Sequence, residues 1–389
     1  MRIRTDTLRR VAAKAYLRGS GALTATLLGA RSGPRSFHRV VVVSALSRNN
    51  GIAAGAQLQH AALSACGVDV ELLDAAPSLR NPLFRIKHQP GSAYIFHAGG
   101  PQIPNLIASV LPAAAAAYRI GYWAWELPDP PRDWAGCDRH ISEIWTPSTF
   151  SRDSLGKQSN RPIEVVPHFV RAEPARRRDW TLPFTVLALA DSRSSWSRKN
   201  PAGAILAFRK AFGGSSHARL LLKLSGPASD VDLFIASIRH LLSNTNVEIL
   251  RERLDANALR RLYRTADALL SLHRAEGYGL PMHEAMAQGV PVVATGWSGN
   301  LDYMSSNDSC LVPCKLVPVH DVSGVYSDSL WAEPDLDAAA LYLRRLADDR
   351  AYYDRLSAGA YVRACSARPR FPVNLPANSG TPNAARVFA

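Results

Sequence analysis

The sequence predicts an α/β protein made of two doubly wound, Rossmann-like domains. The chain has 389 residues, more than a single hydrophobic core usually supports. Short apolar, β-branched runs alternate with segments of helical character, which is typical of parallel sheets covered by helices. The alternation stops at a polar, proline-bearing segment, residues 173–182, and then begins again. We therefore expect two domains, over residues 36–172 and 183–366, joined by that linker.

The first domain opens with the run RVVVVSAL, residues 39–46, whose uninterrupted apolar character indicates a buried parallel strand. A glycine-containing loop then leads into a helix over residues 56–67. Ser148 is a suitable N-cap for a later helix. The other elements expected here are strands at 68–74, 92–98, 118–127, 143–148 and 163–170, and helices at 103–118 and 149–156.

The second domain repeats this alternation. It opens with the strand FTVLALAD, residues 184–191, and a helix over 200–212 with Pro201 near its first turn. Further strands are expected at 218–226, 247–250, 267–274 and 290–295, and further helices at 229–243 and 255–266. Each half therefore predicts its own doubly wound sheet.

The net charge of +14 favours an anionic partner such as a phosphorylated substrate or a phospholipid surface, unless the scattered basic residues form no functional patch. We expect no nucleic-acid partner, because the chain has no aromatic–basic recognition module. No apolar run approaches the roughly 18 residues that a membrane span needs. The five cysteines include no CxxC pair, so neither a disulfide framework nor a zinc site is expected.

The two ends of the chain differ from the domains. Residues 1–35 form a basic leader without a convincing cleavage site, and we expect it either to touch a membrane surface or to be a frayed terminus. Residues 367–389, rich in Pro, Asn and Ala, are expected to be irregular or disordered. These features predict a cytoplasmic protein, peripheral at the inner face of the plasma membrane if the leader binds there.

The segment HRAEGYGLPMHEAMAQGVPVVATGWSGN, residues 273–300, carries the strongest chemical signal. In a parallel sheet, a loop that follows a strand's carboxyl end lines the ligand crevice. Gly277 and Gly279 allow the backbone to approach a ligand, and the following helix presents its N-terminus to an anion. Glu276 and Glu284 can accept hydrogen bonds from hydroxyl groups. A ligand with phosphates and many hydroxyls is a nucleotide sugar, whereas the alternative is a helix whose first-turn glutamate only complements the dipole.

This segment resembles the Glu-x7-Glu motif of retaining family-4 (group 1) glycosyltransferases, which have the GT-B fold of two Rossmann-like domains facing a cleft. Tyr278 stands where the family usually has Phe. The resemblance implies that Glu276 contacts the donor sugar and that Glu284 binds the ribose hydroxyls. It also implies that the backbone of Gly277, Gly279 and Leu280 approaches the sugar and diphosphate.

Further segments extend the resemblance. The string DSRSSWSRKNPAGAILAF, residues 191–208, implies that Arg198 and Lys199 hold the diphosphate, although a solvated basic turn is the alternative. Segments at 121–134, 143–154 and 295–304 are similar to a bacterial subgroup that builds surface polysaccharides, including mannosyltransferase-like members. Three residues of the last segment are further donor-binding candidates: Ser298, Gly299 and Asn300.

The N-terminal half offers fewer candidates. His97 and Glu126 each follow an expected strand, so either is a candidate catalytic residue. A satisfied, partly buried histidine and a structural salt bridge are the respective alternatives. The loop with Gly51 and Gly55 lies against the donor phosphates or is a plain turn.

We expect no metal and no cofactor beyond the donor substrate. The strings at 230–232 and 335–337 have the Asp-x-Asp spacing of metal-dependent transferases, but both lie at expected helix starts, where Asp serves as a cap. The expected activity is transfer of a hexose, with mannose as a guess, from a nucleotide-diphosphate sugar to a lipid-linked or polysaccharide acceptor, with retention of configuration. The alternatives are a degenerate GT-B protein that binds nucleotide sugar without turnover, motivated by a terminal helix that looks shortened or lost, and a GT-B nucleotide-sugar epimerase.

Overall fold

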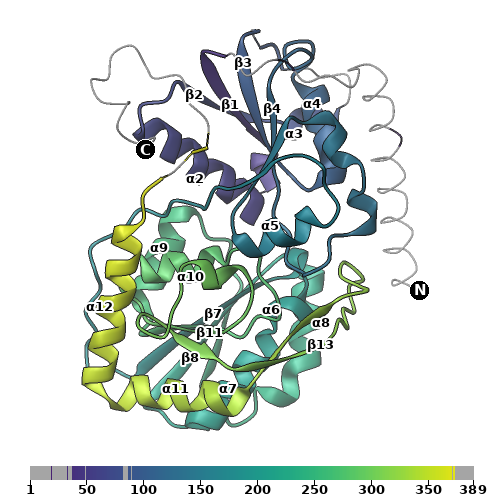
Figure 1. Ribbon diagram of the computed structural model, residues 1–389. Coiled ribbons are helices and arrows are strands. Elements are labelled where there is room, and N and C mark those ends of the chain that lie inside the picture. Colours follow the sequence, from purple (N-terminus) through teal and green to yellow (C-terminus); the bar gives the residue numbers. More distant parts are fainter. Residues whose placement is uncertain are drawn as a thin grey trace. The chain divides into compact units, whose positions relative to one another are not determined.

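The computed structural model describes residues 19, 33, 37–48, 50–81, 86–88, 90–369 and 371–372. The chain forms two compact units (Figure 1). Unit 1 contains the described residues up to Trp125, Asp129–Phe169 and the chain from Arg368, and unit 2 contains Glu126–Pro128 and Val170–Ala367. The basic leader, apart from two residues, and most of the C-terminal tail lie outside the described residues.

Unit 1 is built on a six-stranded sheet in the order β2-β1-β3-β4-β5-β6, and its strands pair in parallel. The apolar runs of the sequence form its core, with Val40, Val42 and Ile95 fully buried. The strands are β1 (Arg39–Ser44), β2 (Val70–Asp74), β3 (Ser92–His97), β4 (Arg119–Tyr122), β5 (Glu143–Thr146) and β6 (Ile163–Val165). The helices are α2 (Gly51–Ala65), α3 (Ala76–Arg80), α4 (Ile103–Ser109) and α5 (Thr149–Gly156).

All the strands predicted for unit 1 are present, but several boundaries were wrong. The last strand, for example, was predicted over 163–170 and ends at Val165. Helix α2 begins at Gly51 and not at residue 56, because the side chain of Asn50 caps it by accepting a hydrogen bond from the Ala53 N–H. The helix predicted over 103–118 ends at Ser109, ahead of Pro112, which could not continue it. The strand predicted over 118–127 ends at Tyr122, and helix α3 was not predicted. Ser148 caps α5 as expected.

Unit 2 contains a second six-stranded parallel sheet in the order β12-β11-β10-β7-β8-β9. Apolar clusters cover both of its faces. The strands are β7 (Phe184–Asp191), β8 (Ala218–Ser225), β9 (Val247–Leu250), β10 (Ala268–Ser271), β11 (Val292–Thr295) and β12 (Cys310–Val312). The helices are α6 (Trp196–Lys199), α7 (Pro201–Phe212), α8 (Ala228–Ile238), α9 (Ala256–Thr265), α10 (Leu280–Met286), α11 (Leu336–Asp348) and α12 (Arg350–Ser366).

Two features of unit 2 were not expected from the sequence. The antiparallel strands β13 (Cys314–Pro318) and β14 (Leu330–Pro334) form a separate hairpin after β12. The terminal helix is not lost, because α12 has 17 residues and the chain joins unit 1 again at Arg368. Within unit 1, the ring of Phe371 lies 6.1 Å from that of Trp145. The expectation of a shortened or lost terminal helix, which had motivated the alternative of a degenerate GT-B protein, is therefore wrong.

Each sheet has one topological switch point, where successive strands are added on opposite sides of the first. In unit 1 this point lies between β1 and β3, and in unit 2 it lies between β7 and β10. Open parallel sheets bind ligands outside the carboxyl ends of the strands at such points. Two switch points therefore define where sites are to be sought.

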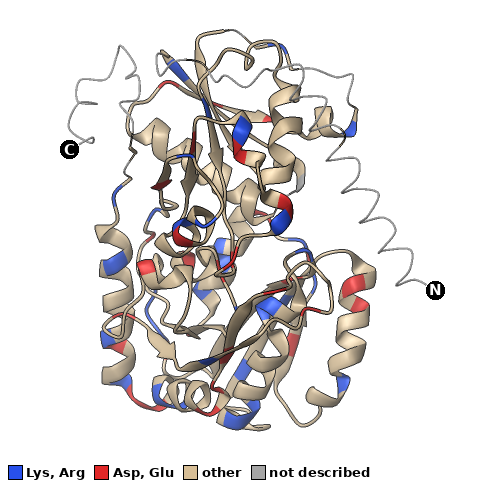
Figure 2. Cartoon of the chain, turned by 45° about the vertical axis from the view of Figure 1, so that its right-hand side comes forward, with Lys and Arg blue, Asp and Glu red and all other residues tan. Residues whose placement is uncertain are grey.

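Basic and acidic residues are interspersed along the described elements of both units in the view of Figure 2. Within the described residues, no helix is long and apolar enough to cross a membrane.

Candidate active site

Glu276 lies at the switch point of unit 2, in the loop between β10 and α10. Its backbone is fixed on both sides, because its N–H donates to Ser298 Oγ at 2.9 Å and its carbonyl accepts from the Gly299 N–H at 2.9 Å. Ser298 holds this position with φ 80° and ψ −153°, a backbone conformation that non-glycine residues rarely adopt. Ser298 and Gly299 thus position Glu276.

The carboxylate of Glu276 lies between two cations. Lys199 Nζ contacts Glu276 Oε1, and Arg198 Nη1 lies 3.2 Å from Glu276 Oε2. Burial by itself would raise the pKa of Glu276, but the charges of Lys199 and Arg198 outweigh it and lower the pKa to about 2. Glu276 is therefore an anion at every physiological pH. It can accept hydrogen bonds but cannot act as an acid.

Lys199 and Arg198 are held differently, although they are neighbours in sequence. Arg198 is 3% exposed, and its guanidinium also donates to the carbonyl oxygens of Ser194 and Ala275. The side chain of Lys199 is 16% exposed and lines a small pocket of about 10 Å³ with Glu276. Lys199 is thus the cation that remains nearer to solvent, whereas Arg198 braces the turn that carries Glu276.

The short helix α6 that carries both cations is bracketed by two non-glycine residues with positive φ. Ser195 has φ 66° and caps α6, and Asn200 has φ 51° and caps α7 through an Oδ1 bond to the Gly203 N–H. Asn200 also donates to the Leu272 carbonyl at the end of the β10 region. Strained backbone of this kind persists only where the surrounding structure holds it, and it gathers at functional sites.

Three side chains complete the cluster, and only the first of them, Glu126, was predicted from the sequence. Glu126 Oε1 lies 3.7 Å from Arg198 Nη2, and the Tyr326 hydroxyl donates to Glu126. The Tyr326 ring faces the Arg198 guanidinium at 5.6 Å. Asp321 accepts from Ser195 Oγ at 2.6 Å and from the Tyr326 N–H at 3.2 Å. The loop between β13 and β14 therefore supports the two cations, and the sequence offered only an Asp-x-Ser-Gly turn signal for it.

Glu126 belongs to unit 2 in the structure, although it follows a strand of unit 1 in the sequence. Its contacts with Arg198 and Tyr326 are those of the salt-bridge alternative.

The sequence had suggested that Glu284 lies in the first turn of α10. It lies in the second turn, because α10 begins at Leu280. The side chain is half-buried and accepts a hydrogen bond from the Tyr263 hydroxyl at 2.8 Å. Burial raises the pKa of Glu284 to about 7, and the bond from Tyr263 only partly offsets this. Glu284 thus differs from Glu276, since it exchanges its proton near neutrality.

The glycine-rich part of the loop is tightly packed. Gly279 caps α10 with φ 90°, and a Cβ built there would lie 2.2 Å from Met282 Cε. The Gly279 carbonyl accepts from the Tyr303 hydroxyl at 2.7 Å. Only glycine fits this position. Gly277 is buried in the same loop, and Leu280 begins the helix.

Asn300 is fully buried beside this loop. Its Nδ2 donates to the Thr295 carbonyl at 3.1 Å, and its Oδ1 has no partner among the described residues. An unpaired buried acceptor is costly and is retained where it has a purpose.

His97 is at the end of β3 in unit 1, and its ring is 2% exposed. The ring nitrogen Nε2 lies 2.5 Å from Gln59 Oε1, and the ring stacks on Tyr122 at 4.3 Å. Burial lowers the pKa of His97 well below its ordinary value, so the ring is neutral. These contacts favour the satisfied-histidine interpretation.

Gly51 and Gly55 lie inside α2 and do not form the loop that the sequence suggested. Gly51 is the first residue of the helix and has open space around it, whereas Gly55 packs against His168.

The two Asp-x-Asp strings lie at helix starts, as expected. Asp335 caps α11 by accepting from the N–H groups of Asp337 and Ala338, and Asp230 lies in the first turn of α8. Among the described residues, no group of three or more His, Cys, Asp and Glu side chains could hold a metal ion.

Residues 195–362 match the family model described as glycosyl transferases group 1. This segment contains both cations, both loop glutamates and the β13–β14 hairpin. A comparison with curated proteins found no match.

The structure resembles several solved proteins. One is Anabaena HepE in complex with UDP-glucose, with a TM-score of 0.59 and 13% identity over 84% of this chain and 94% of that one. Another is Staphylococcus aureus TarM in complex with UDP, with a TM-score of 0.52 and 14% identity over 71% of this chain and 52% of that one. A third is the pneumococcal O-GlcNAc transferase GtfA with UDP and GlcNAc, with a TM-score of 0.51 and 14% identity over 71% and 54%.

At this level of identity the likeness shows the fold, which is GT-B with two Rossmann-like domains, as the sequence predicted. The chain spans about half the length of the staphylococcal and pneumococcal proteins. The retaining family-4 assignment and the mannosyltransferase-like subgroup stay predictions.

Proposed function

We propose that the protein is a glycosyltransferase that uses a nucleotide-diphosphate hexose as donor. The observation that carries this proposal is the ionised, buried Glu276, held by Lys199 and Arg198 at the switch point of unit 2, within the segment that matches group 1 glycosyl transferases. The similar structures that contain UDP together with glucose or GlcNAc support a nucleotide sugar as the donor.

Each residue has a role that follows from its environment. Glu276 accepts hydrogen bonds from donor-sugar hydroxyls, because its carboxylate stays ionised. Lys199 neutralises charge on the leaving diphosphate, and the N-terminal N–H groups of α10 next to Gly279 add a partial positive charge. Glu284 accepts from the ribose hydroxyls. Arg198, Tyr326 and Asp321 keep Glu276 and Lys199 in place.

We propose further that the configuration of the sugar is retained. Glu276 is a weak base, because Lys199 and Arg198 lower its pKa to about 2. A front-face displacement, in which the leaving phosphate helps to remove the proton from the acceptor hydroxyl, requires no stronger base from the protein. The acceptor proposed is a lipid-linked saccharide or a polysaccharide, at the cytoplasmic side of a membrane.

Product analysis tests this proposal. The purified protein is incubated with UDP-glucose, UDP-GlcNAc and GDP-mannose, with and without saccharide acceptors, and the products are identified by mass spectrometry and by the anomeric NMR signal. Transfer that is lost in Glu276→Gln, with nucleotide affinity maintained, supports the proposal. Donor consumed by epimerisation without an acceptor, or donor bound but never consumed, contradicts it. A new bond of inverted configuration contradicts the retaining mechanism alone.

Metal independence is tested in the same assay. Because the proposed charge neutralisation comes from Lys199 and a helix N-terminus, transfer is expected to continue in EDTA at an unchanged rate. A strict requirement for Mg²⁺ or Mn²⁺ would return attention to Asp230 and Asp232.

A further inference from the structure

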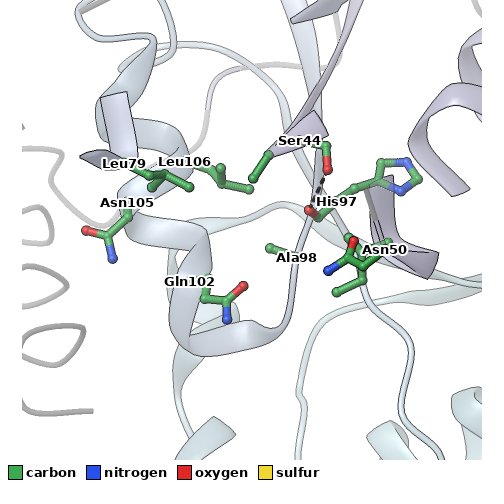
Figure 3. A pocket seen from close by; sticks show the side chains of 10 residues that line it. Ser44, Asn50, Leu79, His97, Ala98, Gln102, Asn105 and Leu106 are labelled. Carbon is green, nitrogen blue, oxygen red and sulfur yellow. Dashed lines mark hydrogen bonds between the residues drawn. The ribbon is translucent and has the colours of Figure 1, made fainter. Parts of the chain in front are cut away.

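A second pocket lies within unit 1, at the switch point between β1 and β3. Its volume is about 70 Å³, several times the ~10–15 Å³ that one ordered water needs. Ser44 at the end of β1 and His97 with Ala98 at the end of β3 form its base. Figure 3 shows the Ser44 hydroxyl bonded to the His97 carbonyl, while the His97 ring points away from Leu79 and Asn105. This pocket is thus in the position where doubly wound sheets bind ligands.

The polar side chains of the lining are three amides, the Ser44 hydroxyl and the His97 imidazole, whose pKa burial lowers well below its ordinary value. Asn50 projects from the N-terminus of α2, and Gln102 and Asn105 come from the start of α4 (Figure 3). The Nδ2 of Asn105 is buried and has no partner among the described residues. The rest of the lining is apolar, mainly Leu79 and Leu106. A donor without a partner next to an open pocket indicates a ligand that accepts hydrogen bonds.

The pocket lining contains no Lys, Arg, Asp or Glu. The pocket at the corresponding switch point of unit 2 is lined by Lys199 and Glu276. Burying a charged ligand group costs much free energy unless an opposite charge meets it. The unit 1 pocket therefore suits a ligand without charge.

We propose that this pocket binds an uncharged sugar ring, and that this ring is the part of the acceptor that unit 1 recognises. Amide and hydroxyl groups pair with sugar hydroxyls as both donors and acceptors, and Leu79 and Leu106 cover the apolar face of a ring. The pocket excludes uronic acids and sugar phosphates. The identity of the ring as an acceptor rests on the proposed function, whereas its lack of charge rests on the pocket itself.

The test uses the full chain and saturation-transfer NMR titrations. The neutral probes are methyl glucoside, methyl mannoside and methyl galactoside, and the charged counterparts are glucuronic acid and glucose 6-phosphate. We expect at least one neutral glycoside to bind and the charged sugars to bind at least fivefold more weakly. Asn105→Leu and Gln102→Leu should each lower the affinity for the neutral glycoside at least fivefold. Asn160→Leu replaces an exposed amide of the same unit and should change nothing.

The outcomes separate the two proposals. Neutral binding that depends on Asn105 or Gln102, with no transfer from any nucleotide sugar, supports the pocket and overturns the proposed function. The pocket proposal is overturned if the charged sugars bind more strongly than the neutral glycosides. It is also overturned if neither substitution changes the affinity for the neutral glycosides. Transfer to a neutral acceptor that neither substitution affects overturns the acceptor assignment alone. If Asn105→Leu fails to fold, as circular dichroism would show, Gln102→Leu decides the matter.

Discussion

At the scale of single residues, the two loop glutamates are the same kind of side chain in opposite electrostatic environments. Glu276 has two cations beside it and a pKa lowered to about 2, whereas Glu284 has burial and one hydroxyl donor and a pKa raised to about 7. Both glutamates belong to the same motif, but their pKa values differ. The cause is the set of neighbours that each acquires on folding.

Glu284 makes stability depend on pH. Its pKa is about 4.5 in the unfolded chain and about 7 when folded, so the folded state binds more protons between these values. The stabilisation is present below pH 4.5 and is lost as the pH rises through 7. Relative to Glu284→Gln, the unfolding free energy of the wild type should fall by up to about 1.4 kcal/mol for each pH unit across this window. Urea unfolding of both proteins at pH 5, 6, 7 and 8 measures it.

Tyr263→Phe is the control for this prediction. It removes the hydrogen bond that lowers the pKa of Glu284, so the pH dependence should extend to higher pH. A difference between wild type and Glu284→Gln that is the same at all four pH values would contradict the prediction.

Arg198 and Lys199 should separate stability from activity. Arg198→Ala leaves Glu126 without its cation and removes the bonds to Ala275 and Ser194, so we expect it to cost about 3–5 kcal/mol of unfolding free energy. Lys199→Ala removes a more exposed charge and should cost less, yet it should lower turnover with a nucleotide sugar by at least tenfold. Urea unfolding and initial rates measure the two effects. If Lys199→Ala is the more destabilising change, the roles have been assigned the wrong way round.

At the scale of elements, strained and capped turns hold the site. The helices α6, α7 and α10 each begin at a residue with positive φ, and two of these residues, Ser195 and Asn200, are not glycine. Their backbone strain is offset by contacts from distant parts of the chain, such as the bond from Ser195 to Asp321. The hairpin loop between β13 and β14 therefore belongs to the site as much as the loop that follows β10.

Gly279→Ala tests the turn before α10. The added methyl meets Met282 and takes a φ of 90°, so unfolding should become easier by about 1–3 kcal/mol. The matched control is Gly51→Ala, which adds a methyl with nothing within 4 Å at the first residue of α2. That change should stay within about 0.5 kcal/mol of wild type. Equal effects of the two substitutions in thermal or urea unfolding would show that the turn does not require glycine.

At the scale of the whole molecule, the net charge of +14 belongs to the full chain, including the residues outside the described elements. Eight of the cations lie in the leader, outside the described residues: Arg2, Arg4, Arg9, Arg10, Lys14, Arg18, Arg31 and Arg35. Each cation near an anionic leaflet contributes about 1 kcal/mol, screened beyond about 8 Å at physiological salt.

We therefore expect salt-reversible binding to vesicles that contain anionic lipid. Flotation at low and high salt, with the intact chain and with residues 1–35 removed, measures this binding. The intact chain should float at low salt only, and the truncated chain should float less. Neutral vesicles are the control. An intact chain that ignores anionic vesicles at low salt removes the membrane proposal and leaves the site in unit 2 unaffected.

The sequence by itself determined the two parallel sheets, the strand before Glu276, the turn at Gly279 and the caps of α5 and α11. These features depend on residues a few positions apart, whose periodicity and turn chemistry can be read directly. Some local boundaries were nevertheless wrong, and the start of α2 was missed because the glycines and not Asn50 were taken as the signal. The GT-B fold followed because each half carried its own complete pattern.

Only the tertiary structure decided the rest of the site. It placed Glu126 in unit 2, gave Arg198 a bracing position, and brought Asp321 and Tyr326 to the cations. It also formed the uncharged pocket from the ends of β1 and β3, the starts of α2 and α4, and α3. Lys199 meets Glu276 across 77 residues, and Ser195 meets Asp321 across 126. Contacts over such separations depend on how sheets and helices pack, and no local pattern encodes them. The pKa values follow from those contacts, which is why two glutamates of one motif differ.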